Sequence, residues 1–172
     1  MIKILLTGFM AAGKTTMGSE IAARYGLEFF DTDSIIEKRA QKSIARIFAD
    51  SGEDFFRQLE SESFAQLLVE RKNSSFIVST GGGLILQAKN RELVAKVIVV
   101  FLDTDFCSIY GRLQRDIQKR PLILGLNETE IERLFLQRRK KYLEYADHVV
   151  KNVDELDKLI KKLNEQVKAD DT

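Results

Sequence analysis

The chain has 172 residues, enough for one α/β domain with a sizeable core, and its net charge of +1 excludes both a strongly basic nucleic-acid-binding surface and an acidic solvating tail. The single cysteine, Cys107, excludes an intrachain disulfide, and no apolar run approaches the ~18 residues of a membrane span. Because a strand is expected almost at Met1, we predict no signal peptide. Together with the single cysteine, this predicts a cytoplasmic protein. We expect it to be a monomer that binds neither nucleic acid nor a membrane.

A phosphate-binding loop is the first motif of the chain. Residues 8–16 read GFMAAGKTT and fit the pattern G-x-x-x-x-G-K-[ST]. The apolar run 2–6 before the loop predicts a buried parallel strand, and residues 17–25 after it have helical spacing. Because chance rarely produces the whole motif between a strand and a helix, we predict a nucleoside triphosphate site rather than a simple glycine turn.

The residue types of this loop suit phosphate binding. Gly8 and Gly13 allow backbone angles that bring N–H groups onto phosphate oxygens at a helix N-terminus. The Lys14 ammonium is expected to reach the β- and γ-phosphates, and the Thr15 hydroxyl is expected to bind Mg²⁺. The expected ATP contacts of the loop are Gly8, Ala11, Ala12, Gly13, Lys14, Thr15 and Thr16.

Two carboxylates, Asp31 and Asp33, follow a second predicted strand at 27–30. Ligands of open α/β sheets bind outside the carboxyl ends of the strands. In an extended stretch the two side chains would point in opposite directions, one toward metal and phosphate and the other toward an acceptor. The alternative is that Asp33 only caps a helix at 34–40, but the nearby phosphate loop favours a functional role.

Residues 43–72 are predicted to be helical in two pieces that break near Gly52. The second piece carries an apolar stripe made of Phe55, Phe56, Leu59, Phe64, Leu67 and Leu68. Arg57 lies off the clearest part of this stripe, and its local interpretation is a surface arginine paired with Glu60.

Three consecutive glycines, Gly81, Gly82 and Gly83, follow a third buried strand at 76–78. An ordinary flexible turn is one explanation. Because other strand ends of this chain also carry candidate functional residues, we favour a surface that a ligand approaches closely.

The remaining elements alternate between helix and strand. Helices are predicted at 87–95, from the cap 103–105 to about 115, from the capping box of Asn127 and Glu130 to about 146, and at 154–167; strands are predicted at 96–102 and 147–150. The charge run 138–141 is interpreted locally as a solvated helix face, and His148, in the last strand, as a structural residue.

A basic stretch of poor periodicity, 112–126, contains the only proline of the chain. Its cations are Arg112, Arg115, Lys119 and Arg120. A plain surface loop is possible, but in a phosphate-loop kinase we favour a lid that brings arginines to the phosphates and excludes water.

The alternation predicts a single domain, 1–172, with a three-layer α/β/α sandwich around a five-stranded parallel sheet. At this level of detail the chain resembles the shikimate kinase family, within the nucleoside-monophosphate-kinase-like group of P-loop folds. The resemblance covers nearly the whole chain and rests on Gly8 to Thr16, FDTD at 30–33 with Ile36 and Glu37, Gly52, Glu53, Phe56, Arg57 and Glu60, TGGG at 80–83, RPL at 120–122, and Arg138 before Tyr142 and Ala146-Asp147.

The resemblance implies ATP-dependent phosphorylation of the 3-hydroxyl of shikimate and the sheet order 2-3-1-4-5. It implies a substrate-binding helical region at about 33–61 and a lid at about 112–126. The residues that it assigns to shikimate are Asp33, Arg57, Gly81, Gly82, Gly83 and Arg138; it places Thr15 and Asp31 at Mg²⁺, Arg112 at adenine, and Arg120 at the phosphates. Lys14, Asp33 and Arg120 are the expected catalytic residues.

The chain departs from the family pattern at several positions. Ala11 replaces a usual glycine of the loop, Gln41 replaces another, Lys140 replaces a common proline, and the spacing from Arg112 to Arg120 is one residue longer than usual. Two other classes stay open at this stage: a kinase for gluconate or a nucleotide, and a nucleotide-binding module without catalysis. The glycine run and the spaced arginines argue against a gluconate or nucleotide kinase. The carboxylate on the acceptor side argues against a module without catalysis, because pure nucleotide binding does not need it.

Overall fold

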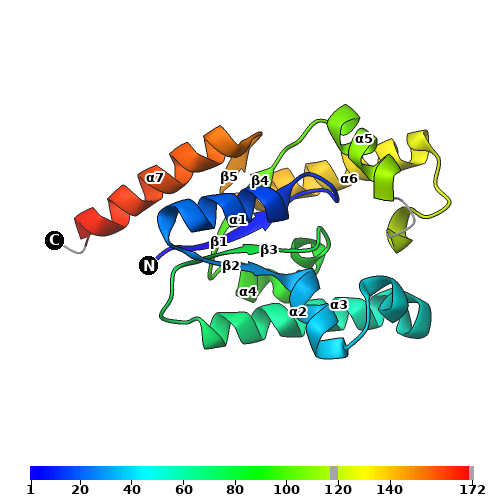
Figure 1. The fold of residues 1–172 in the computed structure, drawn as a ribbon, viewed down its shortest axis with the longest axis horizontal. Coiled ribbons are helices and arrows are strands. Elements are labelled where there is room, and N and C mark those ends of the chain that lie inside the picture. Colours follow the sequence, from blue (N-terminus) through cyan, green and yellow to red (C-terminus); the bar gives the residue numbers. More distant parts are fainter. Residues whose placement is uncertain (117–119, 171–172) are drawn as a thin grey trace.

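The computed structural model describes residues 1–116 and 120–170, and a five-stranded parallel sheet forms its centre (Figure 1). The strands are β1 Lys3–Thr7, β2 Glu28–Asp31, β3 Phe76–Ser79, β4 Ile98–Leu102 and β5 His148–Val150. Their order, β2-β3-β1-β4-β5, confirms the expected topology. In the central strand, Leu5 lies opposite Val78 of β3 and Val99 of β4.

Helices cover both faces of the sheet, which confirms the three-layer sandwich (Figure 1). The α-helices are α1 Lys14–Tyr25, α2 Thr32–Ala40, α3 Ile44–Glu70, α4 Arg91–Val94, α5 Phe106–Asp116, α6 Glu128–Tyr145 and α7 Val153–Asp170. Helices α1 and α7 lie side by side on one face, and α3 and α4 lie on the other. Among the described residues, no helix combines the length and the hydropathy that crossing a bilayer requires.

The main core lies between the sheet and its helices. Strand residues such as Ile4 and Ile77 are fully buried, because parallel strands covered on both faces present apolar side chains to each layer. Gly18 lets α1 approach the sheet closely. A Cβ at this position would lie 2.7 Å from Phe29 Cε2 and 2.8 Å from Leu6 Cδ1, so a larger residue would push the helix away.

A smaller apolar cluster joins α2 to the N-terminal part of α3. It is formed by Ile36, Ile47 and Phe56. The predicted break of the long helix is confirmed at Gly52, whose φ of 79° and ψ of 178° are not helical. The prediction for Phe55 is wrong: 45% of it is exposed, because its neighbour Phe56 occupies the inward face of the helix.

The helix predicted at 87–95 is confirmed only in its second half, as the short helix α4. The chain forms two 3-10 turns, Leu84–Leu86 and Ala88–Asn90, before the short helix α4. The buried Asn90 side chain donates a hydrogen bond of 2.9 Å to the carbonyl oxygen of Leu84. This side-chain contact closes a compact turn that helical periodicity alone does not reveal.

The stretch 112–126 is attached to the core more firmly than the sequence suggested. Helix α5 extends through its first residues, and Leu113 is buried. After the gap, Pro121–Ile123 forms a 3-10 turn in which Ile123 is 0% exposed. The stretch thus contacts the core on both sides of the gap, and its predicted cation Lys119 lies outside the described residues.

Candidate active site

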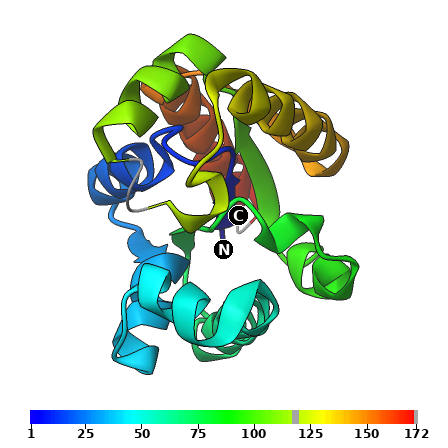
Figure 2. The same cartoon turned by 90° about the vertical axis from the view of Figure 1, so that its right-hand side faces the viewer.

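The predicted functional residues gather at the carboxyl end of the sheet, where the loops after β1, β2 and β3 meet (Figure 2). Two adjoining cavities open there. The acceptor cavity, of about 460 Å³, is lined by residues of α2, α3 and the glycine run 81–83. The phosphate cavity, of about 560 Å³, is lined by the phosphate loop, Asp31 and residues 79–82. The lining residues common to both are Met10, Asp33, Gly81, Gly82 and Arg120, so the cavities join there.

The phosphate loop connects β1 to α1 as predicted. Gly8 and Gly13 have φ angles of 150° and 101°, which side chains disfavour. Lys14 Nζ donates to the carbonyl oxygens of Gly8 and Phe9, each at 3.0 Å. Desolvation lowers the pKa of Lys14 to about 8. A phosphate anion beside this ammonium would favour its charged form and raise the pKa again.

Ala11 shows why glycine is common at its position in the loop. Its φ is 59°, in the left-handed region, which costs about 1 kcal/mol for a residue with a Cβ. Arg112 Nη1 donates to the carbonyl oxygens of Ala11 at 3.0 Å and Ala12 at 3.1 Å, so α5 supports the loop at this point. The contact of Arg112 with adenine stays a prediction.

Thr15, Asp31 and Ser79 bring oxygen atoms together at the floor of the phosphate cavity. Thr15 Oγ1 donates to Asp31 Oδ2 at 2.7 Å and lies 3.5 Å from Ser79 Oγ. Within residues 1–116 and 120–170, no cluster of three or more His, Cys, Asp or Glu side chains could hold a metal ion. Mg²⁺ commonly takes one or two carboxylates together with phosphates and water, so this hydroxyl and carboxylate fit that ion.

The alternative of a helix cap at Asp33 is wrong, because the residue that caps α2 is Asp31. Asp31 Oδ1 accepts hydrogen bonds from the backbone N–H groups of Asp33 at 3.0 Å and Ser34 at 3.3 Å. The strand ends at Asp31 and α2 begins at Thr32, so the two carboxylates do not share an extended stretch. Their side chains diverge because a strand turns directly into a helix between them.

Asp33 is left free for another partner. Its Oδ1 is buried and accepts no hydrogen bond from any described residue. Burial raises the pKa of Asp33, and the nearby Asp31 carboxylate raises it further. A carboxylate with raised basicity on the wall between two cavities can accept a hydrogen bond from a hydroxyl group placed there.

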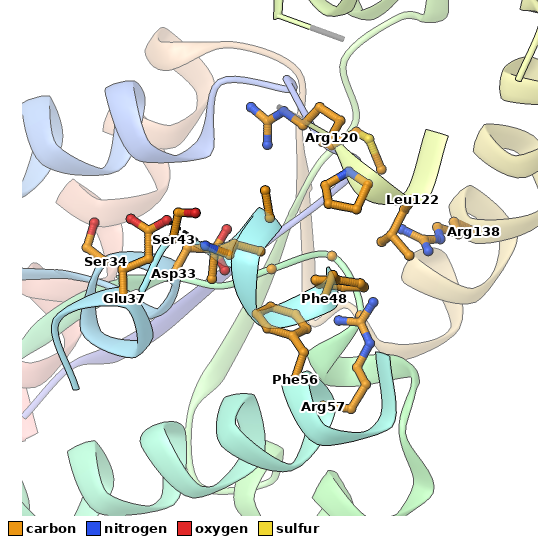
Figure 3. Close-up of a pocket in the computed structure, with 17 residues that line it drawn as sticks. Asp33, Ser34, Glu37, Ser43, Phe48, Phe56, Arg57, Arg120, Leu122 and Arg138 are labelled. Carbon is orange, nitrogen blue, oxygen red and sulfur yellow. Dashed lines mark hydrogen bonds between the residues drawn. The ribbon is translucent and has the colours of Figure 1, made fainter. Parts of the chain in front are cut away.

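Two arginines lie across the acceptor cavity from Asp33. Figure 3 shows the guanidinium groups of Arg57, from α3, and Arg138, from α6, on one side of the cavity and Asp33 on the other. Arg57 Nη1 donates to Glu60 at 2.9 Å, while its Nε and Nη2 donate to Glu53 at 3.1 and 3.0 Å. The predicted Glu60 pair is confirmed. The surface interpretation of Arg57 is wrong, because the side chain lines the cavity and is only 13% exposed.

The charge run 138–141 is likewise not simply a solvated face. Arg138 lines the acceptor cavity. Arg139 holds Asp103, after β4, by two hydrogen bonds of 2.7 and 2.6 Å. This bidentate pair fixes the rotation of α6 on the sheet.

The glycine run is required by protein packing. A Cβ on Gly81 would collide with Glu60 Oε1, one on Gly83 would collide with Arg57, and one on Gly82 would lie 2.5 Å from the Tyr142 hydroxyl. The explanation as a flexible turn therefore fails. The three glycines pack closely against these side chains, and their backbone atoms line the two cavities.

Arg120 lies where the two cavities join (Figure 3). Its positive charge is close enough to lower the pKa of Lys14, so the two cations act on the same region. A ligand with several negative charges, such as a polyphosphate, would stabilise the charged forms of Lys14 and Arg120 together.

Comparison with known proteins shows to which family the chain belongs. The family model for shikimate kinase matches residues 10–168. The chain belongs to the shikimate kinase family. It is a kinase, an enzyme that transfers the γ-phosphoryl group of ATP to an alcohol acceptor.

Several shikimate kinases are similar along most of their length. The enzyme of Actinobacillus succinogenes is 42% identical over 147 residues, which cover 84% of this chain and 82% of that protein. The enzyme of Macrococcus caseolyticus is 33% identical, with 97% of both chains covered. The solved shikimate kinase of Acinetobacter baumannii, in complex with shikimate, has a TM-score of 0.85 and 34% identity over 98% of this chain and 95% of that one.

Three residues that line the site or pack directly against it were not identified as site residues from the sequence. Ser79 lies beside Thr15, Glu60 lies beneath Gly81, and Tyr142 lies beneath Gly82. Glu60 is 0% exposed, its Oε1 has no hydrogen-bond partner among the described residues, and burial raises its pKa to about 7. A signal existed for two of them, because Glu60 and Tyr142 follow site arginines at helical spacings of three and four residues.

Proposed function

We propose that this shikimate kinase phosphorylates the 3-hydroxyl of shikimate at the junction of the two cavities, with Asp33 at the reacting hydroxyl. One observation carries the proposal: Asp33 Oδ1 is a buried acceptor without a hydrogen-bond partner among the described residues, on the wall that both cavities share. A hydroxyl from the acceptor side and a phosphoryl group from the other side can meet only there.

The charges of the acceptor cavity support shikimate as the substrate. Shikimate carries a carboxylate at one end of its ring and hydroxyls at the other. Arg57 and Arg138 would hold the carboxylate by charge-assisted hydrogen bonds, while Asp33 on the opposite side would receive the hydroxyl (Figure 3). The backbone of residues 81–83 would support the ring.

Asp33 would orient the attacking oxygen and take up its proton. The raised pKa of this carboxylate, caused by burial, increases its basicity. Phosphoryl transfer has a loose transition state, so orientation of the hydroxyl would contribute more than proton removal.

The phosphate cavity would bind ATP through the loop. Lys14 would exchange its contacts with the Gly8 and Phe9 carbonyl oxygens for the β- and γ-phosphates, and Arg120 would contact the same phosphates. Thr15 and Asp31 would hold Mg²⁺, which neutralises phosphate charge.

We also expect the enzyme to act as a monomer in the cytoplasm, as predicted from the sequence.

The test is ADP release in a coupled assay with shikimate, gluconate and nucleoside monophosphates as acceptors. We expect turnover with shikimate alone, and a loss of at least ~10³-fold in the Lys14→Met enzyme, because the ammonium neutralises the charge that develops on the β- and γ-phosphates during transfer. Circular dichroism and thermal unfolding check that the variant is folded. Equal turnover with gluconate or a nucleotide would refute the substrate, and near-normal turnover of folded Lys14→Met would refute the site.

A further inference from the structure

Tyr142 is a buried polar residue that the mechanism above does not use. It lies on α6, one helical turn after Arg138, and is 1% exposed. Its hydroxyl donates a hydrogen bond of 2.7 Å to the carbonyl oxygen of Gly82. Its ring packs at 5.2 Å from the ring of Phe101 on β4, so the side chain has a fixed support in the sheet.

Gly82 lies between this hydroxyl and the phosphate loop. A Cβ on Gly82 would lie 2.5 Å from Tyr142 Oη and 2.9 Å from the carbonyl oxygen of Gly8. The same Gly8 oxygen accepts the 3.0 Å hydrogen bond from Lys14. Gly82 is therefore closely packed between Tyr142 and the loop, with no room for a side chain.

Arg138, which lines the acceptor cavity, lies four residues before Tyr142 on the same face of α6. Its positive charge opposes the rise in the pKa of the phenol, which burial brings to about 12. The hydroxyl consequently keeps its proton and remains a donor to Gly82 over the pH range in which the enzyme would work. Tyr142 therefore joins the glycine run to the part of α6 that carries Arg138.

We propose that Tyr142 is a positioning residue that holds Arg138 and the Gly82 backbone in the geometry that binds the shikimate carboxylate and ring. This inference rests on the proposed function. Its chemical basis is that a single buried hydroxyl, supported by the sheet, ties the Gly82 backbone to the helix that carries Arg138 and so sets these two substrate-binding groups relative to each other. It acts through its neighbours and does not contact the reacting atoms.

The test compares Tyr142→Phe with Tyr145→Phe, which removes a phenolic hydroxyl from the same helix at a half-buried position outside both cavities. Isothermal titration gives the dissociation constants of shikimate and of ADP. We expect Tyr142→Phe to weaken shikimate binding about five- to tenfold, because the Gly82 carbonyl loses its hydrogen-bond donor and the glycine run is no longer tied to the helix that carries Arg138. ADP binding should change less than about twofold, and Tyr145→Phe should bind both ligands as the wild type does.

A double-mutant cycle with Arg138→Ala separates positioning from general loosening of the fold. The effect of Tyr142→Phe on shikimate affinity should shrink when the arginine is already absent. If the variant is less stable, the rise in melting temperature that shikimate causes yields the same affinity comparison. Unchanged affinity in Tyr142→Phe, or full additivity with Arg138→Ala, would overturn the inference. A wild-type enzyme that neither binds nor phosphorylates shikimate would instead overturn the proposed function.

Discussion

At the scale of single residues, Asp31 and Asp33 are predicted to have different functions, because their environments differ. Asp31 is bound by Thr15 and by two backbone N–H groups, whereas Asp33 Oδ1 has no hydrogen-bond partner among the described residues. We expect Asp33→Asn to lower kcat by ~10²–10⁴-fold while ADP affinity changes little, since general-base and orienting contributions have this size.

Asp31→Asn should instead raise the Mg²⁺ concentration that gives half-maximal activity. Asparagine is also a good N-cap, so α2 should stay folded in this variant. Initial rates over a Mg²⁺ titration, with ADP binding measured by calorimetry, separate the two variants. An identical defect in nucleotide binding for both would contradict this division of roles.

Glu60 predicts a pH dependence of stability. Burial raises its pKa from 4.5 to about 7, against the opposing charge of Arg57 and with a smaller contribution from Asp33 in the same direction. A carboxyl with a raised folded-state pKa contributes stability that is fully present below the unfolded pKa and is lost as the pH rises through about 7.

Glu60→Gln removes this titration and keeps an acceptor oxygen for Arg57. Between pH 5 and pH 8 the free energy of unfolding should decrease in both proteins. The decrease should be smaller in Glu60→Gln than in the wild type, by roughly 2 kcal/mol. Urea unfolding across this pH range gives the comparison. The control is Glu53→Gln, which alters the exposed partner of the same arginine. Parallel pH curves for wild type and Glu60→Gln would contradict the assignment.

At the scale of elements, the stretch around Arg120 is predicted to close over bound substrates. The structure limits this prediction, because Ile123 is fully buried and Leu113 anchors the end of α5. We expect hydrogen exchange across residues 120–126 to slow when ADP and shikimate are both bound, since closure would keep water from the phosphate. Exchange that is already slow in the free enzyme and unchanged by ligands would show that this segment is no lid.

Arg120→Ala tests the same element kinetically. Turnover should fall at least ~10-fold while shikimate affinity changes little, because the contact with the phosphates tightens as charge shifts in the transition state. Arg115→Ala, which changes an exposed arginine of α5, is the matched control. A larger loss in shikimate affinity than in kcat would place Arg120 on the acceptor instead.

Local motifs explain which elements the sequence could predict. The phosphate loop and the capping box of Asn127 and Glu130 depend on residues within a few positions, and both are confirmed. The helix at 87–95 is shorter than predicted, because a tertiary arrangement around the buried Asn90 replaces its first half with a 3-10 turn. The helical spacing from Arg138 places Tyr142 on the face of the site, but its partner Gly82 lies 60 positions away in the sequence, and only the fold brings the two together.

At the scale of the whole molecule, sequence alternation predicted the layers, and the family resemblance supplied the strand order. Periodicity alone does not order parallel strands, because strands buried on both faces look alike. The pairing of β3 with β1 on one side and with β2 on the other is what brings the phosphate loop, the glycine run and Asp33 together. The catalytic arrangement is thus a property of topology, to which each local motif adds one group.

The junction of the two cavities has a consequence for inhibitor design. The phosphate cavity is built from a loop that many nucleotide-hydrolysing proteins share, so a drug confined to it would meet numerous off-targets. The acceptor cavity, with paired arginines on one side and a lone aspartate on the other, offers features that are harder to find elsewhere. Both cavities share the lining residues Met10, Gly81 and Gly82, so a short linker passing these residues could join an anionic ring to a phosphate mimic. The phosphate mimic would add affinity, and the ring in the acceptor cavity would add selectivity.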